Sequence, residues 1–160
     1  MSKSDKLSAV LASGEVLLAD GATGTMLQAA GLPPDKVPEQ WNIEQPEQIL
    51  GLHRAYLEAG SRIILTNTFG GSRIKLARAG RADLTIEVNQ VATRLARSAA
   101  GDRAFVAGDI GPCGELLQPY GLLSYADAVA AFTEQAAALA EGGVDLIWVE
   151  TMASLEEARA

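Results

Sequence analysis

Cysteine and histidine are nearly absent from the sequence, and this limits the chemistry that the chain can perform alone. Its 160 residues include one cysteine, Cys113, and one histidine, His53. A single cysteine excludes an internal disulfide, and with one histidine it cannot form a metal cluster unless carboxylates complete the ligand set. We therefore expect this segment to bind no metal on its own.

Long apolar runs and clusters of basic residues are also missing. No stretch of about 18 apolar residues could span a bilayer, and Met1–Ala12 lacks the apolar core of a signal peptide. The formal net charge is −7, without any block of five like charges. Nucleic acids and anionic membranes require clustered Lys and Arg, so neither is an expected partner. The sequence favours a cytoplasmic protein.

The residues that are present predict a single α/β domain covering residues 1–160. A hydrophobic content of 48% supports a buried core, and an aromatic content of 5% makes that core mainly aliphatic. Short apolar runs without polar alternation are typical of parallel strands that are covered on both faces. Four such runs recur, at Val16–Ala19, Arg62–Leu65, Ala104–Ala107 and Asp145–Val149.

Amphipathic helical patterns separate these runs. Apolar residues recur at helical spacing after Pro46, from Leu84 to Leu95, and after a capping box at Ser124–Asp127. Gly60 and Gly142–Gly143 end two of the helices. The resulting β-α-β-α-β-α-β order predicts a parallel sheet with right-handed crossovers.

The C-terminal residues predict the start of a fourth helix. Ser154–Glu157 has the pattern of a capping box, and barely two turns follow before Ala160. Our interpretation is that the chain is truncated. A short natural terminal helix is the alternative.

Polar and glycine-rich segments follow all four predicted strands. Parallel α/β folds place their chemistry at this edge of the sheet. Asp20 and Glu150 stand directly at strand ends, and Asp109 lies close behind a third strand. Carboxylates there can hold an ammonium group, while the backbone of Gly21–Gly24 can approach a ligand carboxylate. The pattern therefore predicts a site for a small zwitterion.

Each of these features also has a structural interpretation. Asp20 and Gly21 can form a simple turn, and Glu150 can favour the positive end of the helix that follows it. Thr66–Phe69 can be a strand end with a hydrogen-bonded threonine pair. We therefore keep both interpretations open at these positions.

Other conspicuous residues are expected to be structural. Cys113, between Pro112 and Gly114, is expected to be a small loop residue, and His53 is expected on a helix surface. Trp41 and Trp148 are expected to be packing residues, although Trp41 could lie over a ligand. The glycine-rich segment after the first strand lacks the spacing and the lysine of a phosphate loop, and no dinucleotide-binding pattern follows that strand.

Five motifs together resemble the homocysteine S-methyltransferase family. The resemblance covers roughly Val16 to Thr151, nearly the whole chain, and the motifs occur in the family's order. They are Asp20-Gly-Ala-Thr-Gly-Thr25, Pro38-Glu-Gln-Trp-Asn42, Leu65-Thr-Asn-Thr-Phe-Gly-Gly71, Gly108-Asp-Ile-Gly-Pro112 and Trp148-Val-Glu-Thr151.

The resemblance implies a (β/α)8 TIM barrel, of which this chain supplies about the first four β/α units. In the family, the residues that match Asp20, Gly21 and Glu150 contact the amino-acid portion of homocysteine. The second-strand motif lines the same pocket, and it corresponds here to Thr66, Asn67, Thr68 and Phe69. No residue of the segment corresponds to a catalytic group or a metal ligand.

The resemblance also implies a methyltransferase that converts homocysteine to methionine. A thiol is reactive as its thiolate, and zinc keeps it in that form. The family holds zinc with three cysteines after later strands, and Cys113 matches none of them. We therefore expect a zinc enzyme in the full-length parent and no activity in this segment alone.

The methyl donor and the assembly state remain open from the sequence. Betaine, methyltetrahydrofolate and S-methylmethionine all serve relatives as donors. One alternative is a non-catalytic half-barrel that binds an amino acid or a partner chain, including another copy of itself. Another is a complete small doubly wound domain with unrelated chemistry.

Overall fold

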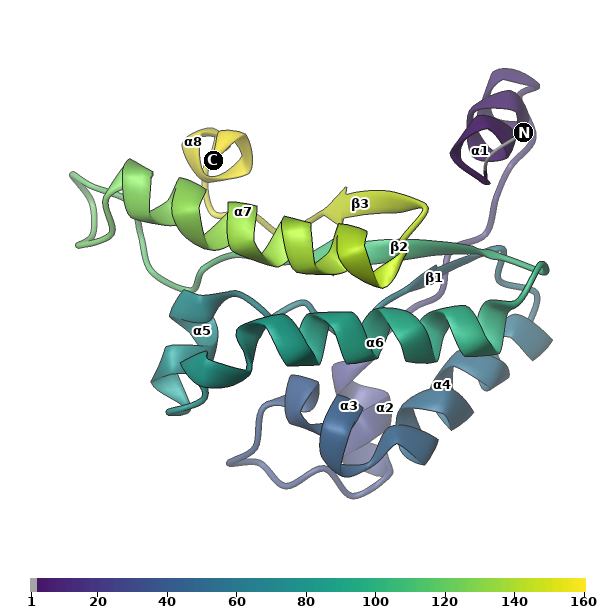
Figure 1. The fold of residues 1–160 in the computed structure, drawn as a ribbon, viewed down its shortest axis with the longest axis horizontal. Helices are drawn as coiled ribbons and strands as arrows, with labels where there is room; N and C mark the ends of the chain where they lie inside the picture. The colour runs from purple at the N-terminus through teal and green to yellow at the C-terminus, as the bar shows by residue number, and fades with distance from the viewer. Residues whose placement is uncertain (1–2) are drawn as a thin grey trace.

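Parallel β-strands form the centre of the structure (Figure 1). The computed structural model describes residues 3–160. Its sheet has the order β1 (Ile63–Leu65), β2 (Phe105–Ile110) and β3 (Leu146–Val149), with both neighbouring pairs parallel. The register places Ile64 beside Val106 and Asp109 beside Trp148. The predicted parallel α/β organisation is therefore confirmed.

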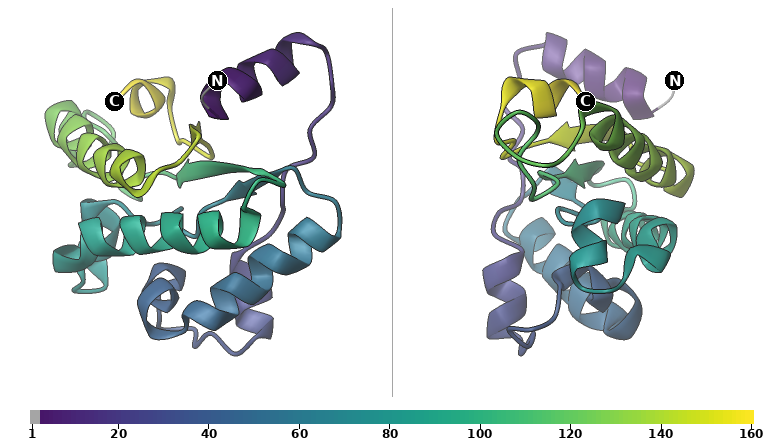
Figure 2. Two further views of the ribbon diagram at one scale, coloured as in Figure 1. Left: turned by 45° about the vertical axis from the view of Figure 1, so that its right-hand side comes forward. Right: turned by 90° about the vertical axis from the view of Figure 1, so that its left-hand side faces the viewer.

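Helices connect the strands and cover the sheet. The three longest, α4, α6 and α7, pack in that order against one face, whereas α1 and α8 lie toward the other side (Figure 2). No helix in the described part of the chain is long and apolar enough to cross a membrane. The helical elements are α1 (Lys3–Ala12), α2 (Gly24–Ala29), η1 (Pro38–Gln40), α3 (Trp41–Glu44), α4 (Pro46–Glu58), α5 (Arg73–Arg78), η2 (Ala82–Leu84), α6 (Thr85–Ala100), α7 (Tyr125–Gly142) and α8 (Leu155–Arg159).

Small apolar residues bring α6 close to the sheet. Ala96 and Ala100 of α6 are fully buried in one core cluster with Ile64 of β1 and Val106 of β2. Alanine favours helix formation and leaves room for close approach of the helix to the strands. This packing holds the strands in a fixed position under the loops that follow them.

The predicted helix ends are confirmed. The Ser124 hydroxyl accepts a hydrogen bond from the Asp127 N–H at 3.1 Å, and the Ser154 hydroxyl accepts one from the Glu157 N–H at the same distance. Gly143 ends α7 with a φ of +94°, a left-handed conformation that glycine adopts at little cost. Local chemistry therefore sets where these helices start and stop.

The predicted strand at Val16–Ala19 is wrong as a strand of the sheet. Only Ala19 forms a bridge, a parallel one to Ile63, although the N–H groups of both Arg62 and Ile63 donate to the Leu18 carbonyl. The segment runs beside β1, and no second strand within the described residues pairs with it on its other side. Val16 is accordingly 92% exposed, so little burial supports a regular strand there.

The predicted strand at Ala104–Ala107 is longer in the structure, because β2 continues to Ile110. Pairing with β3 explains the extension, since Asp109 and Ile110 lie beside Trp148 and Val149. Asp109 is therefore a residue of the central strand and not of the loop after it.

His53 is buried, which corrects its predicted place on a helix surface. Its side chain is 1% exposed, and burial lowers the pKa of the imidazole to about 4. The cause is that α4 packs on two sides. Ile49 and Leu52 belong to one core cluster, whereas Leu50 and Leu57 belong to another. His53 lies on the same side of α4 as Leu50 and Leu57. A prediction that assumes only one buried face for α4 therefore places His53 wrongly at the surface.

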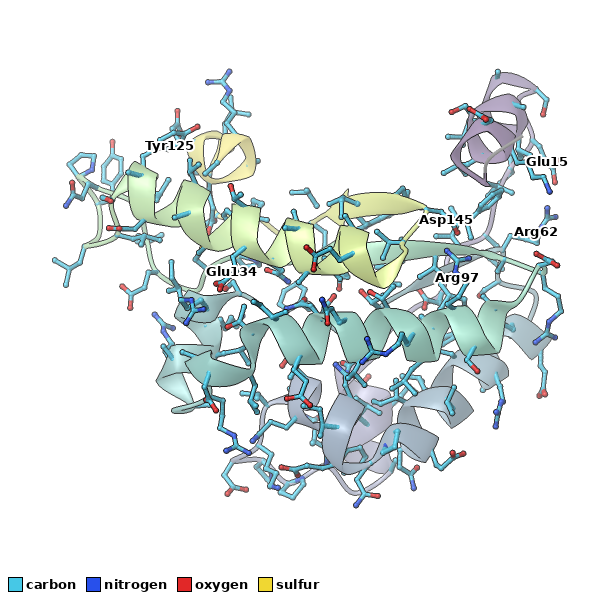
Figure 3. The ribbon with its side chains drawn as sticks, in the orientation of Figure 1. Glu15, Arg62, Arg97, Tyr125, Glu134 and Asp145 are labelled. Carbon is cyan, nitrogen blue, oxygen red and sulfur yellow. The ribbon has the colours of Figure 1, made fainter. Side chains whose placement is uncertain are left out.

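An ion pair fixes the N-terminal end of the sheet. Asp145, just before β3, accepts hydrogen bonds from the Val106 N–H at 2.8 Å and from Arg97 of α6, also at 2.8 Å (Figure 3). These contacts join β2, β3 and α6 at the end of the sheet opposite Glu150. Asp145 is therefore a buried carboxylate with a purely structural environment.

Two helical glycines test the packing of α6 against α7. A Cβ on Gly142 would lie 2.7 Å from the Thr93 Cβ, whereas a Cβ on Gly51 of α4 would meet nothing within 4 Å. We expect Gly142→Ala to lower the free energy of unfolding by about 1–3 kcal/mol through overpacking. Gly51→Ala should raise it by about 0.5–1 kcal/mol through helix propensity. Urea denaturation measures both, and a Gly142→Ala variant as stable as the wild type would contradict the observed helix spacing.

Candidate functional site

A cavity of about 550 Å³ lies at the C-terminal ends of the strands. Parallel pairing brings these ends to one edge of the sheet, where the loops after successive strands meet. The cavity takes its walls from the segment after Ala19, from the strand ends and from η1. Its lining residues are Ala19, Asp20, Gly21, Ala22, Thr23, Gly24, Val37, Pro38, Glu39, Leu65, Asn67, Phe69, Gly70, Lys75, Asp109, Trp148 and Glu150.

Asp20 and Glu150 face the cavity from its two sides. The Leu65 N–H donates to Asp20 Oδ2 at 3.0 Å, and the Trp148 indole N–H donates to Glu150 Oε2 at 3.2 Å. Burial raises the pKa of Asp20 to about 7, against the effect of the Leu65 hydrogen bond, and the charge of Glu150 raises it further. The two carboxyl groups that the sequence predicted at this edge therefore act on one another.

Asp109 adds a carboxyl group from the central strand. Burial raises its pKa to about 8, and the charges of Glu150, Asp20 and Glu39 contribute in that order. Its Oδ1 atom, like Oδ1 of Asp20, is buried without a hydrogen-bond partner among the described residues. The ends of β2 and β3 and the segment after Ala19 thus direct acidic groups into one small space.

Glu39 and Lys75 complete the charges of the cavity. The Gly70 N–H donates to Glu39 Oε1 at 2.6 Å, and burial raises the pKa of Glu39 while the charge of Lys75 opposes this. The Lys75 ammonium lies 4.9 Å from the centre of the Phe69 ring, a cation–π contact. Among the described lining residues, four are acidic and Lys75 alone is basic. The cavity therefore favours a ligand with a cationic group.

Thr66 and Thr68 hold the backbone of Asp109 and do not line the cavity. The Asp109 N–H donates to Thr66 Oγ1 at 3.0 Å, and the Thr68 hydroxyl donates to the Asp109 carbonyl at 2.7 Å. The Thr66 hydroxyl therefore donates to Thr68 across 2.6 Å. This closed circuit is the hydrogen-bonded threonine pair of the structural interpretation, and it fixes Asp109 in place.

Asn67 lines the cavity, but its amide is committed to the protein. It donates to Asn42 Oδ1 at 2.9 Å and to the Pro38 carbonyl at 2.8 Å, while Asn42 donates back to the Asn67 carbonyl at 2.9 Å. The pair ties the end of β1 to the segment that carries Glu39. Asn67 thus shapes the wall of the cavity.

The glycine-rich segment after Asp20 is anchored by α4. The Tyr56 hydroxyl donates to the Ala22 carbonyl at 2.9 Å, and a Cβ on Gly21 would lie 3.3 Å from the Tyr56 hydroxyl oxygen. A glycine at this position lets the loop pass close to the tyrosine. The loop is therefore held against the cavity.

The structure brings most of the predicted site residues together. Those that line the cavity are Asp20, Gly21, Asn67, Phe69 and Glu150, whereas Thr66 and Thr68 support it from behind. Sequence reasoning did not assign Glu39 or Lys75 to the site. Glu39 lies within the motif Pro38–Asn42, which was its signal, whereas Lys75 on α5 belongs to none of the five motifs.

The two tryptophans have different roles. Trp41 is buried in the core cluster of α4, as predicted for a packing residue. Trp148 was expected to pack in the same way, but it lines the cavity and binds Glu150. Its position in the strand pattern, two residues before Glu150 and on the same face, is the signal that could have identified it.

Comparison with known proteins identifies the family. The family model described as homocysteine S-methyltransferase matches residues 17–160. The chain belongs to this family.

Methionine synthases are among the relatives of this chain. The methionine synthase of Mycobacterium tuberculosis (strain ATCC 25618 / H37Rv) is 36% identical over 160 residues, which is 92% of this chain and 13% of that protein. The methionine synthase of Mycobacterium leprae (strain TN) is 34% identical over 157 residues, 91% of this chain and 13% of that protein. The chain thus spans about an eighth of the length of these relatives.

Solved structures of the family share the fold. The homocysteine methyltransferase MmuM from Escherichia coli, in its oxidized form, has a TM-score of 0.80 and 26% identity. The match covers 94% of this chain and 58% of that chain. Its metallated form has a TM-score of 0.80 and 25% identity, covering 94% of this chain and 59% of that chain. The described fold is therefore similar to part of these enzymes.

A metal ion does not fit the residues of this chain. Within residues 3–160, no group of three or more His, Cys, Asp and Glu side chains is arranged to hold one. Cys113 is buried, as expected for a small loop residue, and its N–H donates to Glu157 Oε1 at 2.9 Å. Burial and the charge of Glu157 raise the pKa of its thiol to about 11, which disfavours the thiolate that zinc binds.

The acidic cavity predicts a pH-dependent stability. Asp20 and Asp109 have raised pKa values, about 7 and about 8, so these groups bind more protons in the folded chain than in the unfolded chain between about pH 4 and 8. Stability therefore falls as the pH rises through these values. His53 has a lowered pKa and acts in the opposite direction, but only between its folded value of about 4 and its unfolded value of about 6.5. Between about pH 6.5 and 8, the titration of His53 therefore no longer opposes the loss of stability that Asp20 and Asp109 cause.

Asp109→Asn should reduce this loss of stability with rising pH, because the variant has no carboxyl group at position 109 to ionise in the cavity. We expect its melting temperature to exceed that of the wild type increasingly from pH 6.5 to 8.5, by roughly 2–4 °C for each kcal/mol of penalty removed. Thermal unfolding at both pH values measures this. The exposed Glu47→Gln serves as the control, and parallel curves for wild type and Asp109→Asn would contradict the prediction.

Proposed function

We propose that this chain recognises the amino-acid portion of homocysteine within a homocysteine S-methyltransferase. The observation that carries the proposal is the cavity that Asp20 and Glu150 both line, in a chain that belongs to this family. The ammonium group of an α-amino acid can donate charge-assisted hydrogen bonds to such carboxylates. The family supplies the identity of the amino acid.

The other walls of the cavity suit the rest of the ligand. Lys75 offers a positive charge to the ligand carboxylate, and the backbone of the Gly21 segment can approach it closely. Trp148 and Leu65 give apolar surface for the methylene groups next to the thiol. The chain thus binds and orients the acceptor of the methyl group.

The proposed architecture is the first four β/α units of a (β/α)8 barrel. The support is that Val16–Ala19 runs parallel beside β1, as a fourth strand would, and that the chain matches 58% of the length of MmuM. In such a barrel the cavity lies at the face where the chemistry of these folds takes place.

The proposed reaction is zinc-dependent transfer of a methyl group to the homocysteine thiol, which gives methionine. Zinc, when bound, would hold the sulfur as a nucleophilic thiolate. Its ligands would come from outside this segment, as would the contacts that select betaine, methyltetrahydrofolate or S-methylmethionine as donor. We therefore expect the segment alone to bind homocysteine without turnover.

A non-catalytic role in binding a partner chain is the second candidate. Apolar side chains at both edges of the sheet favour it, because Val16 is 92% exposed and Val149 is 51% exposed. Free edges of this kind pair readily with other chains. Sedimentation of the 160-residue chain in the presence and absence of homocysteine separates the candidates. A folded assembly that binds no homocysteine supports the second.

Loss of either flanking carboxylate should weaken homocysteine binding. Asp20→Asn and Glu150→Gln each remove a charge-assisted contact to the ammonium group, on the order of 1.5–3 kcal/mol. We expect the dissociation constant for L-homocysteine to rise about tenfold to a hundredfold in each variant. Isothermal titration calorimetry of the 160-residue chain under reducing conditions measures it.

Glu47→Gln is the matched control, since Glu47 is exposed on α4 and outside the cavity lining. It should bind homocysteine as the wild type does. Circular dichroism checks that every variant is folded. Unchanged affinity in both cavity variants would show that the ammonium group lies elsewhere, and a folded wild type that does not bind homocysteine would reject the proposed function.

A further inference from the structure

Asp109 has a carboxyl group that the protein leaves without a partner. The residue is 6% exposed and lines the cavity, and its Oδ1 atom meets no hydrogen-bond donor in the described part of the chain. Native proteins pair nearly all buried polar atoms, and an unpaired one costs stability. Such an atom at the wall of a cavity points to a ligand that supplies the missing donor.

The backbone of Asp109 is held independently of its side chain. Thr66 and Thr68 bond its N–H and its carbonyl, and the Gln135 amide lies within 3.5 Å of the same carbonyl. None of these bonds uses the carboxyl group. The side chain is therefore aimed into the cavity from the central strand without being needed to hold that strand.

The groups that face Asp109 select the kind of ligand atom that it can bind. Asp20, Glu150 and Glu39 all place negative charge near it, from three different segments. Lys75 lies on the wall of the cavity over the ring of Phe69. A neutral or anionic ligand atom next to Asp109 would leave this repulsion unrelieved, whereas an ammonium group would relieve it and donate up to three hydrogen bonds.

We propose that Asp109 is a specificity-determining residue whose carboxylate accepts a hydrogen bond from the ammonium group of the bound amino acid. It acts with Asp20 and Glu150, so that the ammonium group lies among three carboxyl groups and the site rejects thiol acids that lack an amino group. This inference rests on the proposed function, because it assigns one more contact to the same ligand. It goes beyond the resemblance, which matches only the two flanking carboxylates to the ligand.

The test compares two ligands that differ in the amino group alone. L-homocysteine and 4-mercaptobutanoate share the thiol, the carbon chain and the carboxylate. Calorimetric dissociation constants for both are measured on the wild-type chain, on Asp109→Asn and on Asp145→Asn. We expect Asp109→Asn to reduce the preference for homocysteine about tenfold or more, since only the ligand with an ammonium group loses a contact.

Asp145→Asn is the matched control. Asp145 is also a buried carboxylate of the sheet, but its contacts with Arg97 and Val106 lie at the opposite end (Figure 3). The control should lower the melting temperature and leave the ratio of the two dissociation constants unchanged. If the ratio of the two dissociation constants changes in both variants in step with their melting temperatures, the inference is overturned. A merely structural role of Asp109 predicts that result.

The outcomes separate the inference from the proposed function. If the folded wild type binds homocysteine and Asp109→Asn keeps the wild-type ratio, the inference is overturned and the proposed function stands. If the folded wild type does not bind homocysteine, both are rejected. Asp109→Ser, which also lacks the carboxylate, is measured in the same way, so that a folding defect in one variant leaves the other to decide.

Discussion

The parallel pairing of β1, β2 and β3 is the constraint on which the rest of the structure depends. Because the three strands point the same way, their C-terminal ends meet at one edge, where β2 supplies Asp109 and the residue after β3 is Glu150. The segment that runs beside β1 adds Asp20 directly after its bridge at Ala19. Burial in a partly dry space opposes ionisation, as do like charges at short range, and the raised pKa values of Asp20 and Asp109 reflect both causes in that order. The geometry that gathers these acids at one edge is therefore also the geometry that disfavours their ionised forms.

Neutral side chains keep this acidic edge in order. The hydroxyls of Thr66 and Thr68 bond the backbone of β2, and the amides of Asn42 and Asn67 join the end of β1 to α3. They satisfy backbone groups that water would otherwise have to reach. Since the threonines bond the backbone of β2, Asp109 Oδ1 stays without a partner among the described residues. Along Thr66–Phe69, the threonines that hold the backbone of β2 thus alternate with Asn67 and Phe69, which line the cavity.

The parts of this arrangement that were predictable have local causes. Apolar runs, capping serines and helix-ending glycines act within a few residues, so the paired strands and the ends of α7 and α8 follow from the sequence. Asp109 was noticed but placed in a loop, because the length of β2 depends on its pairing with β3. His53 was placed on a surface because a helical pattern does not reveal packing on two sides. Lys75 reaches the cavity only through tertiary structure, which no spacing encodes.

Unpaired buried acids link the stability of the chain to its ligand. Side chains placed for ligand binding commonly reduce the stability of the protein without its ligand. The Oδ1 atoms of Asp20 and Asp109 fit this description, because they are buried without a hydrogen-bond partner among the described residues. An ammonium group placed among them would supply the missing donors and offset the repulsion from Glu150. A ligand that binds only the folded state stabilises it by mass action. Here it would also favour the ionised form of the acids, so ligand affinity, proton release and resistance to unfolding would all depend on the same three carboxyl groups.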